Sequence, residues 1–169
     1  MMITKEKFEA LFHEYFHEMG RYVMKFLRDE DLSEEIVQKV FIRLWERREK
    51  YSEISNWKHY LLKAVKNEAI EHLRKKSHEA CLPEDARDIA SDINLPLETI
   101  QHKELKAYIE MALKRLPESC YAVFALKRFE GLTTKETAAK LGISPKTVEN
   151  QMTIAMRKIR DFLAIHDLP

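Results

Sequence analysis

Glycine and proline are scarce in this sequence, which has three glycines and five prolines among its 169 residues. Together they make up about 5% of the chain, whereas globular proteins carry roughly 12%. No glycine lies between Gly20 and Gly131. Because hairpin turns and nucleotide-binding βα turns depend on glycine, this scarcity argues against an all-β fold and against a doubly wound α/β fold.

Long apolar runs are also missing. The longest covers only Cys120 to Leu126, and a transmembrane helix needs roughly 20 apolar residues. The first residues, MMITKEKFEALF, contain no signal-peptide hydrophobic stretch. With 34% charged and 45% hydrophobic residues, the composition suits amphipathic helices. We therefore expect a soluble, cytoplasmic, all-α protein with no direct membrane insertion.

Residues for metal or catalytic chemistry are few. The two cysteines, Cys81 and Cys120, are too few for a disulfide framework and are expected to be free thiols. His78 with Cys81, and His13 with His17, have the spacing of partial metal sites, but no complete four-ligand set occurs. No nucleophile–base set, paired-carboxylate site or phosphate loop stands out. The sequence predicts no metal, no cofactor and no catalytic residues, so no enzyme.

The formal net charge of +1 is unevenly distributed. Residues 1–78 carry a net charge of +2, residues 79–98 of −5, and residues 99–169 of +4. The acidic segment also contains Pro83 and Pro96 and has no sustained helical period. We expect two small helical domains, 1–78 and 99–169, joined by an acidic linker over 79–98.

Three helices are expected in the first domain. The first has one broad apolar stripe, more typical of a core than of a base-stacking platform; its members are Phe8, Leu11, Phe12, Tyr15, Phe16, Met19, Tyr22, Val23, Phe26 and Leu27. Asp31 and Glu34 predict a capped start for the second helix. Its core stripe is Ile36, Val37, Val40, Phe41, Leu44 and Trp45. The third helix is expected over about 56–76, with Trp57, Tyr60, Leu61, Ala64 and Val65 inward.

The outer faces of the second and third helices carry distinct chemistry. On the second, an aliphatic residue lies among polar ones in a strip of helical spacing, which indicates a partner surface or a solvated face: Glu35, Gln38, Lys39 and Ile42. On the third, three cations and an amide suit a strand of phosphates and an exposed base edge, with a lysine-rich solvated face as the alternative. They are Lys63, Lys66, Asn67 and Arg74, together with Ile70.

The second domain has the pattern of a helix-turn-helix. Helices are expected near 98–115 and 118–129, the latter stopping at Gly131. Thr133 and Glu136 form a capping box that opens a short helix ending at Leu141-Gly142. Ser144 caps the last helix, with Pro145 in its first position. A short helix, a glycine-containing turn and a longer capped helix are typical of DNA-binding modules, although helical hairpins that do not bind DNA also use glycine turns.

The last helix has a buried and a polar face. The buried face is expected to hold Val148, Met152, Ala155, Met156, Ile159, Phe162 and Leu163. The polar face has residue types that neutralise phosphate or read bases in a major groove. It consists of Lys146, Asn150, Thr153 and Arg157.

Three segments resemble one family. DLSEEIVQKVFIRLW (31–45) resembles region 2.2 of sigma-70-family transcription initiation factors, YLLKAVKNEAIEHLRKK (60–76) resembles regions 2.3 and 2.4, and residues 116–160 resemble region 4. Two such blocks with a short linker match the extracytoplasmic-function (ECF) group, which keeps only domains σ2 and σ4. The resemblance implies an alternative sigma factor that recognises −10 and −35 promoter elements together with core RNA polymerase.

For the σ2-like domain, the resemblance implies that region 2.2 binds the clamp helices of the polymerase β′ subunit through Glu35, Gln38, Lys39 and Ile42. Lys39 departs from the family pattern, in which an acidic residue is commoner. Asn67 matches an asparagine common where a flipped −10 base is captured, with Lys63, Lys66 and Arg74 as backbone contacts. The loop over about 51–56 would help to choose the base, and Tyr60 stands where tryptophan is frequent.

For the σ4-like domain, the resemblance implies −35 recognition by Lys146, Thr147, Glu149, Asn150, Thr153 and Arg157, while another face holds the β-subunit flap. Thr137 replaces a commoner aliphatic residue. The acidic linker would mimic nucleic acid in the polymerase channel, unless it is only a solvated tether. Promoter DNA and, as in many ECF proteins, an anti-sigma factor complete the expected partners.

The net charge of the two domains indicates whether the protein binds DNA alone or only together with polymerase. Proteins that hold duplex DNA unaided are usually strongly basic. Domains of net +2 and +4 fit better with a factor that relies on polymerase for DNA affinity. The alternative is a stand-alone regulator, because GLTTKETAAKLGISPKTVENQ also resembles the LuxR-type DNA-binding module. A helical adaptor or anti-sigma-like binder would keep these folds without contacting DNA.

Overall fold

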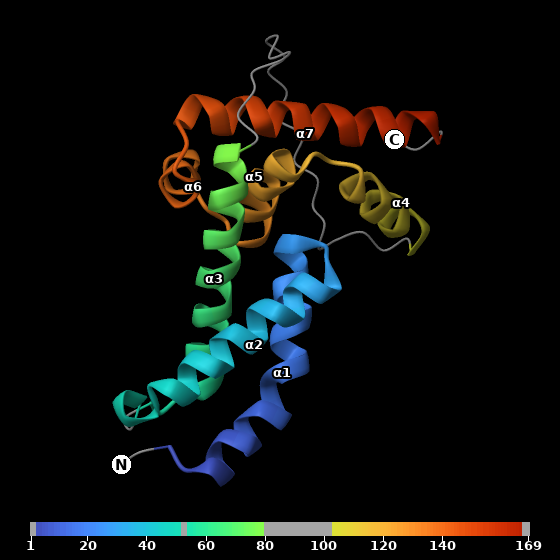
Figure 1. Ribbon diagram of the computed structural model, residues 1–169. Helices are drawn as coiled ribbons and strands as arrows, with labels where there is room; N and C mark the ends of the chain where they lie inside the picture. The colour runs from blue at the N-terminus through green and yellow to red at the C-terminus, as the bar shows by residue number, and fades with distance from the viewer. Residues whose placement is uncertain (1–2, 52–53, 80–102, 167–169) are drawn as a thin grey trace. The chain divides into compact units, whose positions relative to one another are not determined.

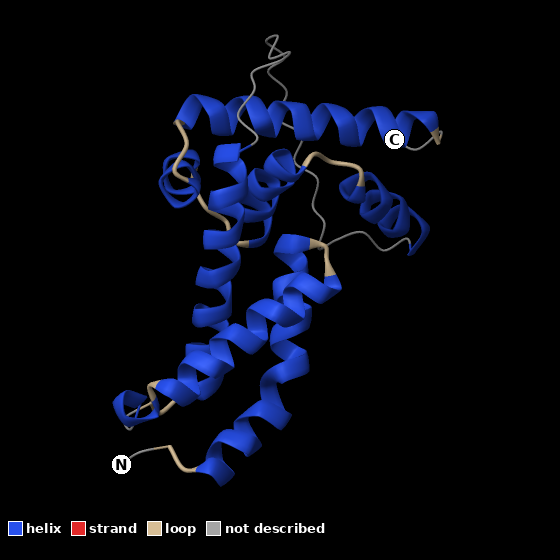
Figure 2. Ribbon diagram, in the orientation of Figure 1, coloured by secondary structure: helices blue, strands red, loops and turns tan. Residues whose placement is uncertain are grey.

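The computed structural model describes residues 3–51, 54–79 and 103–166. All regular structure in these ranges is helical (Figures 1 and 2). The α-helices are α1 (Lys5–Leu27), α2 (Glu30–Glu46), α3 (Trp57–Glu79), α4 (Lys103–Lys114), α5 (Glu118–Phe129), α6 (Thr134–Leu141) and α7 (Pro145–Ile165). A short 3₁₀ helix, η1 (Arg48–Tyr51), follows α2. The all-α prediction is confirmed.

The chain divides into two compact units, Met1–Leu73 and Arg74–Pro169. This agrees with the expectation of two helical domains, although the boundaries 1–78 and 99–169 remain predictions. The acidic segment 79–98, apart from its first residue, lies outside the described residues. Each unit is therefore described by itself below.

In the first unit, α1 packs along α2. The helix α1 begins after Thr4, whose side chain accepts a hydrogen bond from the Lys7 amide. It ends at Arg28, which adopts a left-handed φ of 57° and donates its amide to the Met24 carbonyl. Leu11, Met19 and further apolar residues of the predicted stripe are buried against α2.

The predicted N-cap of α2 was wrong by two residues. The helix begins at Glu30, and its N-cap is Asp29 rather than Asp31. The Asp29 carboxylate accepts from the Leu32 amide at 3.0 Å, and its carbonyl accepts from the buried Ser33 hydroxyl at 2.6 Å. Because Asp29 already satisfies the end of the helix, Asp31 lies inside the first turn, where its negative charge favours the helix dipole.

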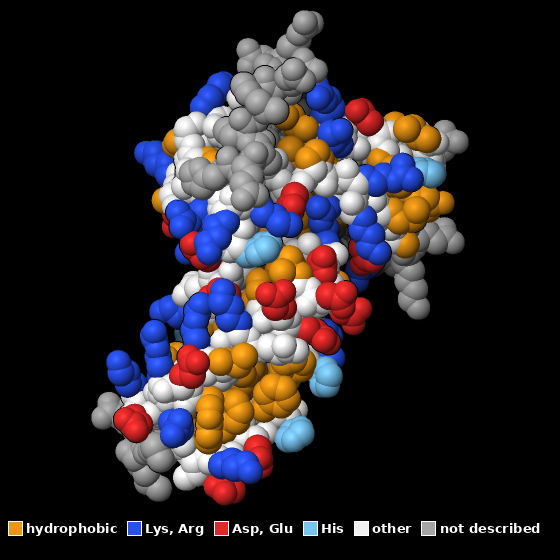
Figure 3. All heavy atoms as spheres, viewed as in Figure 1, with side chains coloured by type: hydrophobic (Ala, Val, Ile, Leu, Met, Phe, Trp, Pro, Cys, Tyr) orange, Lys and Arg blue, Asp and Glu red, His pale blue; other side chains and the backbone are white. Residues whose placement is uncertain are grey.

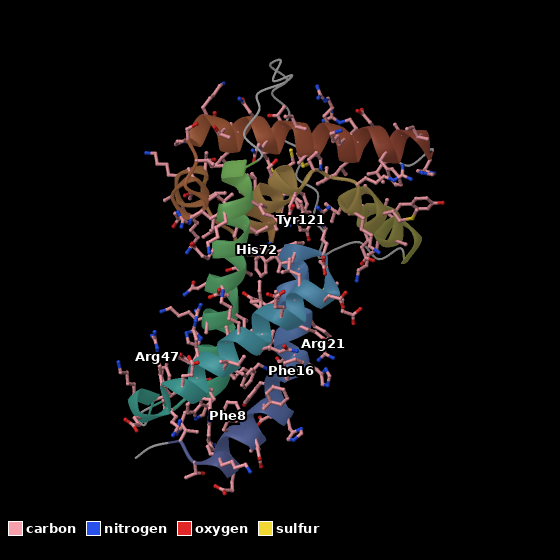
Figure 4. The ribbon with its side chains drawn as sticks, viewed as in Figure 1. Phe8, Phe16, Arg21, Arg47, His72 and Tyr121 are labelled. Carbon is pink, nitrogen blue, oxygen red and sulfur yellow. The ribbon has the colours of Figure 1, made fainter. Side chains whose placement is uncertain are left out.

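The aromatic stripe of α1 packs against aromatic side chains of α2. The ring centroids of Phe12 and Phe41 lie 5.2 Å apart, and those of Phe8 and Trp45 lie 5.1 Å apart. Phe41 is buried, whereas Phe8, Phe12 and Trp45 are half-buried. Figure 4 labels Phe8 and Phe16 along this side of α1, and hydrophobic side chains also reach the surface of the unit (Figure 3). The core interpretation therefore holds, with the rings only partly covered.

The helix α3 completes the first unit. Its buried stripe is Leu61, Val65, Ala69 and Leu73. Lys58 Nζ lies 2.6 Å from Glu18 Oε1 and so ties α3 to α1. The helix runs to Glu79, slightly beyond the predicted end near residue 76. Trp57 and Tyr60, predicted to point inward, are half-buried.

The second unit is built around α7, which packs against α4, α5 and α6. The buried residues of α7 are those predicted, except that Met152 is only half-buried. The capping box predicted at Thr133 and Glu136 is present with both hydrogen bonds, and Gly142 ends α6 in the left-handed region at φ 66°. Because these caps are local, the sequence sets the turn that directs α6 into α7.

Three further expectations can be compared with the described residues. None of the helices described is long and apolar enough to cross a bilayer. No group of three His, Cys, Asp or Glu side chains is placed to hold a metal ion in the part of the chain that the structure covers. Cys120 is a free, buried thiol, and its burial raises its pKa. Cys81 lies outside the described residues.

Candidate functional site

The polar strip predicted on the second helix lies on the exposed side of α2. Its members, which we call the α2 strip, are Glu35, Gln38, Lys39 and Ile42. All four side chains are exposed, and Ile42 is 57% exposed. An isoleucine left in water among polar neighbours contributes nothing to the core, so its burial against a partner would be favourable. The structure thus brings the predicted strip together as one surface.

Lys39 differs from its neighbours because it is ion-paired. Its ammonium contacts Glu68 Oε1 on α3, while Arg43 Nη1 donates to Glu68 Oε2 at 2.7 Å. Burial by itself would raise the pKa of Glu68, but the hydrogen bonds from the two cations outweigh it and lower this pKa below its ordinary value. The Glu68 carboxylate is therefore charged at neutral pH.

The predicted DNA-binding residues of the third helix lie on one side of α3. We call Lys63, Lys66, Asn67 and Arg74 the α3 face. On an ideal helix, Lys63, Asn67 and Arg74 lie within about 40° of one another, with Lys66 beside them. Lys63 and Asn67 are exposed, whereas Lys66 and Arg74 are half-buried. Ile70, expected on the same side, is buried.

An aromatic group surrounds the start of α3. Asn56 caps the helix, since its Oδ1 accepts from the His59 amide at 2.9 Å. The Tyr60 ring lies 5.3 Å from that of Tyr51 and meets the Trp57 ring edge-on at 6.1 Å. Burial and the hydrogen bond with Tyr51 raise the Tyr60 pKa, against the lowering effect of nearby Arg47. These contacts hold the described part of the predicted base-choosing loop against the helix that carries Asn67.

The last helix starts at the predicted cap. The Thr147 amide donates to Ser144 Oγ at 3.0 Å, and the two hydroxyl oxygens lie 2.8 Å apart. Pro145 occupies the first turn. This cap fixes where α7 begins and so where its first side chains stand.

The predicted base-reading residues lie on or beside one side of α7, and together we call them the α7 face: Lys146, Thr147, Glu149, Asn150, Thr153 and Arg157. On an ideal helix, Lys146, Asn150, Thr153 and Arg157 fall within about 60° of one another. Lys146 and Glu149 are exposed, and the other four are half-buried. The Thr153 hydroxyl donates to the Glu149 carbonyl at 3.0 Å. To a bound molecule, Thr153 therefore offers its methyl group and the remaining lone pair of its hydroxyl oxygen rather than a hydrogen-bond donor.

Glu68 is the residue that the sequence analysis missed. The charged residues of α3 are mostly basic, and an acid in such a helix is a signal for a local or interhelix ion pair. Which cations it would meet could not be read from the sequence, because Lys39 and Arg43 are more than twenty residues away on α2. The contact depends on how α2 and α3 are rotated against each other.

Two family models match the chain. The model for sigma-70 region 2 matches residues 11–79, and that for sigma-70 region 4 matches residues 106–159. The ECF RNA polymerase sigma factor SigE of Mycolicibacterium smegmatis is 27% identical over 79% of this chain and 52% of its own length. The RNA polymerase sigma factor SigZ of Bacillus subtilis is 24% identical over 92% of this chain and 86% of its own length. The chain thus spans about half of the first relative and most of the second.

A solved structure is also similar. It is a co-crystal structure of the sigma factor RpoE in complex with the anti-sigma factor NepR from Bartonella quintana; the likeness covers 95% of this chain and 98% of that chain at 18% identity, with a TM-score of 0.47.

The matched regions decide between the two DNA-binding hypotheses. A LuxR-type regulator is not favoured, because the residues preceding the helix-turn-helix match sigma-70 region 2. Region 2 and region 4 occur in this order and together span most of the chain. The chain belongs to the sigma-70 family of RNA polymerase sigma factors and is an alternative sigma factor of its extracytoplasmic-function group.

Proposed function

We propose that this sigma factor docks on the β′ clamp helices of core RNA polymerase through the α2 strip. The observation that supports this most directly is the exposure of Ile42 on the same side of α2 as Glu35 and Gln38. Complete burial of an isoleucine contributes about 1.5–3 kcal/mol, so covering an already half-exposed one contributes roughly 1 kcal/mol. The exposed polar residues around it supply specificity at the rim of such a contact.

The α3 face binds the −10 element in this proposal. The side chains of Lys63, Lys66 and Arg74 carry the positive charge that phosphates require, and Asn67 can bond the edge of an unstacked base. No covalent chemistry is involved. Melting is driven by differential binding, since each captured base offsets the few kcal/mol needed to unpair it.

The α7 face reads the −35 element. Lys146 and Arg157 can contact phosphate or guanine, while Asn150 can pair with adenine. The domains are only weakly basic, so polymerase supplies much of the DNA affinity and the isolated protein binds promoter duplex poorly. Tight, sequence-specific footprints without polymerase would contradict this part of the proposal.

The other partners follow from the family. A second face of the σ4-like domain binds the β flap, the acidic segment 79–98 runs through the polymerase channel, and an anti-sigma factor holds the protein inactive until a signal arrives. These interactions take place in the cytoplasm, where core polymerase acts. The domain limits 1–78 and 99–169 belong to the same proposal.

Reconstituted transcription tests the proposal. Purified core polymerase and this protein are combined on a random promoter library, and run-off products are sequenced. Transcripts that depend on the protein and share −10 and −35 sequences are the expected result. If the protein fails to associate with bacterial core enzyme at micromolar concentration, the proposal is wrong.

Three substitutions test the roles proposed for the α2 strip, the α3 face and the α7 face. Ile42→Ala is expected to weaken core binding, whereas Ile165→Ala, which changes an isoleucine that is 78% exposed on α7, is the matched control. Asn67→Ala should alter −10 melting, and Arg157→Ala should remove −35 dependence. Lys158→Ala is the control for the last variant, because Lys158 is exposed about 100° away from Arg157 on α7. An adaptor that does not contact DNA would keep its activity in all of these variants.

A further inference from the structure

One carboxylate on α3 joins two cations on α2. Glu68 Oε1 contacts Lys39 Nζ, and Glu68 Oε2 accepts from Arg43 Nη1 at 2.7 Å. The Glu68 side chain is only 12% exposed, whereas those of Lys39 and Arg43 are 51% and 47% exposed. We call these three residues the Glu68 clip.

The Glu68 clip lies between two surfaces with different proposed partners. Lys39 is the member of the α2 strip at the edge nearest to α3. Glu68 directly follows Asn67, and consecutive residues of an ideal helix point about 100° apart. Glu68 therefore meets α2 while Asn67 remains exposed on the α3 face. The side chains that reach toward polymerase and those that reach toward DNA are connected through this carboxylate.

Two contacts one turn apart constrain the helices more than apolar packing does. Lys39 and Arg43 are four residues apart on α2, which separates them by about 6 Å along the helix axis. The buried stripe of α3, which includes Leu61, Val65 and Ala69, drives association but has little directional preference. A carboxylate held at both oxygens allows neither sliding nor rotation without breaking a charged hydrogen bond.

The geometry also explains the residue at position 39. In the sigma-70 family an acidic residue is commoner at this position. Such a residue would lie against the Glu68 carboxylate and repel it. Lys39 and Glu68 are therefore a matched pair in this chain. Because the Lys39 ammonium is paired with Glu68, it is less available for a contact with polymerase than the side chains of Glu35, Gln38 and Ile42 are.

We infer that Glu68 is a positioning residue that fixes the rotation of α3 on α2, so that docking of the α2 strip on polymerase places Asn67 at the −10 base. This inference rests on the proposed function of the two faces. Lys39 acts through Glu68, and its main role is to hold α3 rather than to contact polymerase. Ion pairs of this kind contribute little net stability but can select one arrangement of two packed elements.

The test separates polymerase binding from promoter melting. Holoenzyme formation is measured with labelled core polymerase, and melting with the permanganate reactivity of −10 thymines at saturating holoenzyme. Glu68→Gln is expected to change core affinity by less than about threefold and to slow melting about tenfold, a factor that lies within the range of coupling energies for residues in contact. Lys39→Glu should slow melting at least as much, and the charge-swapped variant Lys39→Glu/Arg43→Glu/Glu68→Lys should recover most of the rate, because both ion pairs are then restored with opposite sign.

Glu18→Gln is the matched control. It removes a different interhelix ion pair of α3, that between Glu18 and Lys58, at a place remote from Asn67. Melting at the wild-type rate in Glu18→Gln, with slow melting in Glu68→Gln, supports the inference. Recovery in the charge-swapped variant separates positioning from a general loss of stability, as do thermal unfolding midpoints for each variant.

Different failures have different meanings. Wild-type melting by Glu68→Gln, together with impaired melting by Asn67→Ala, overturns the role of the clip and leaves the proposed function intact. Slow melting in Glu68→Gln that the charge-swapped variant does not recover also overturns the clip, because the effect is then not one of paired charge. Wild-type melting by Asn67→Ala overturns the proposed −10 face and, with it, this inference.

Discussion

The buried hydroxyl of Thr137 is a defect that a single substitution can remove. Thr137 lies on α6 with 0% of its surface exposed. Its amide donates to the Thr133 carbonyl at 2.9 Å, but its Oγ1 is buried without a hydrogen-bond partner among the described residues. Valine has almost the same shape and no hydroxyl. We therefore expect Thr137→Val to stabilise the second unit.

The size of the effect follows from the cost of the unpaired group. A buried hydroxyl with no partner costs about 1–3 kcal/mol, because the hydrogen bonds that it makes to water in the unfolded chain are lost. Threonine and valine have similar helix propensities, so the backbone contributes almost nothing to the difference. We expect a gain of about 1–2 kcal/mol, and each 1 kcal/mol corresponds to roughly 4–8 °C in the unfolding temperature of a unit of this size.

Cys120 supplies a local assay in the full-length chain. It is buried on α5 in the same unit, and burial raises its pKa, so it reacts with thiol reagents only after opening. In a Cys81→Ser background, the labelling rate of Cys120 in increasing urea reports the free energy of unfolding of the second unit. Thr137→Val should slow this labelling, and calorimetry should show a raised transition.

Thr134→Val is the control, because it makes the same chemical change on the same helix. The Thr134 hydroxyl accepts from Lys127 Nζ at 2.9 Å, so its removal should leave the stability unchanged or lower. If Thr137→Val proves no more stable than the wild type, the Thr137 hydroxyl is hydrogen-bonded in solution and the reasoning fails.

Two further predictions concern the first unit. Asp29→Ala removes the N-cap of α2 and should lower the free energy of unfolding by about 1 kcal/mol in urea titrations; an equal loss in Asp31→Ala would show that the cap is not specific to Asp29. The Glu68 pKa lies below its ordinary value of 4.5, so the ion pairs stabilise the fold above that pH and this contribution is lost as the pH falls through the lowered pKa. The stability difference between wild type and Glu68→Gln should therefore shrink on acidification, and a difference that is constant from pH 7 to about 3 would contradict the assignment.

Much of the second unit could be predicted from the sequence. The capping box at Thr133 and Glu136, the left-handed Gly142 and the Ser144 cap all occur where they were expected. Each involves residues only a few positions apart, so the local sequence contains everything that the interaction needs. The same locality explains the error at α2, because Asp29 and Asp31 are both good caps and only the final path of the chain after Arg28 selects one.

The sequence by itself determined that the chain is helical, where its helices turn, and which residues share the outer faces of α2, α3 and α7. Periodicity and capping are properties of neighbours along one helix, so they can be read without the fold. Only the tertiary structure decided that Lys39 and Arg43 meet Glu68 and that the hydroxyl of Thr137 has no hydrogen-bond partner among the described residues. Both results depend on which side chains from distant parts of the chain are brought together, and this is decided by helix packing and by the ion pairs that join the helices, neither of which can be read from neighbours along one helix.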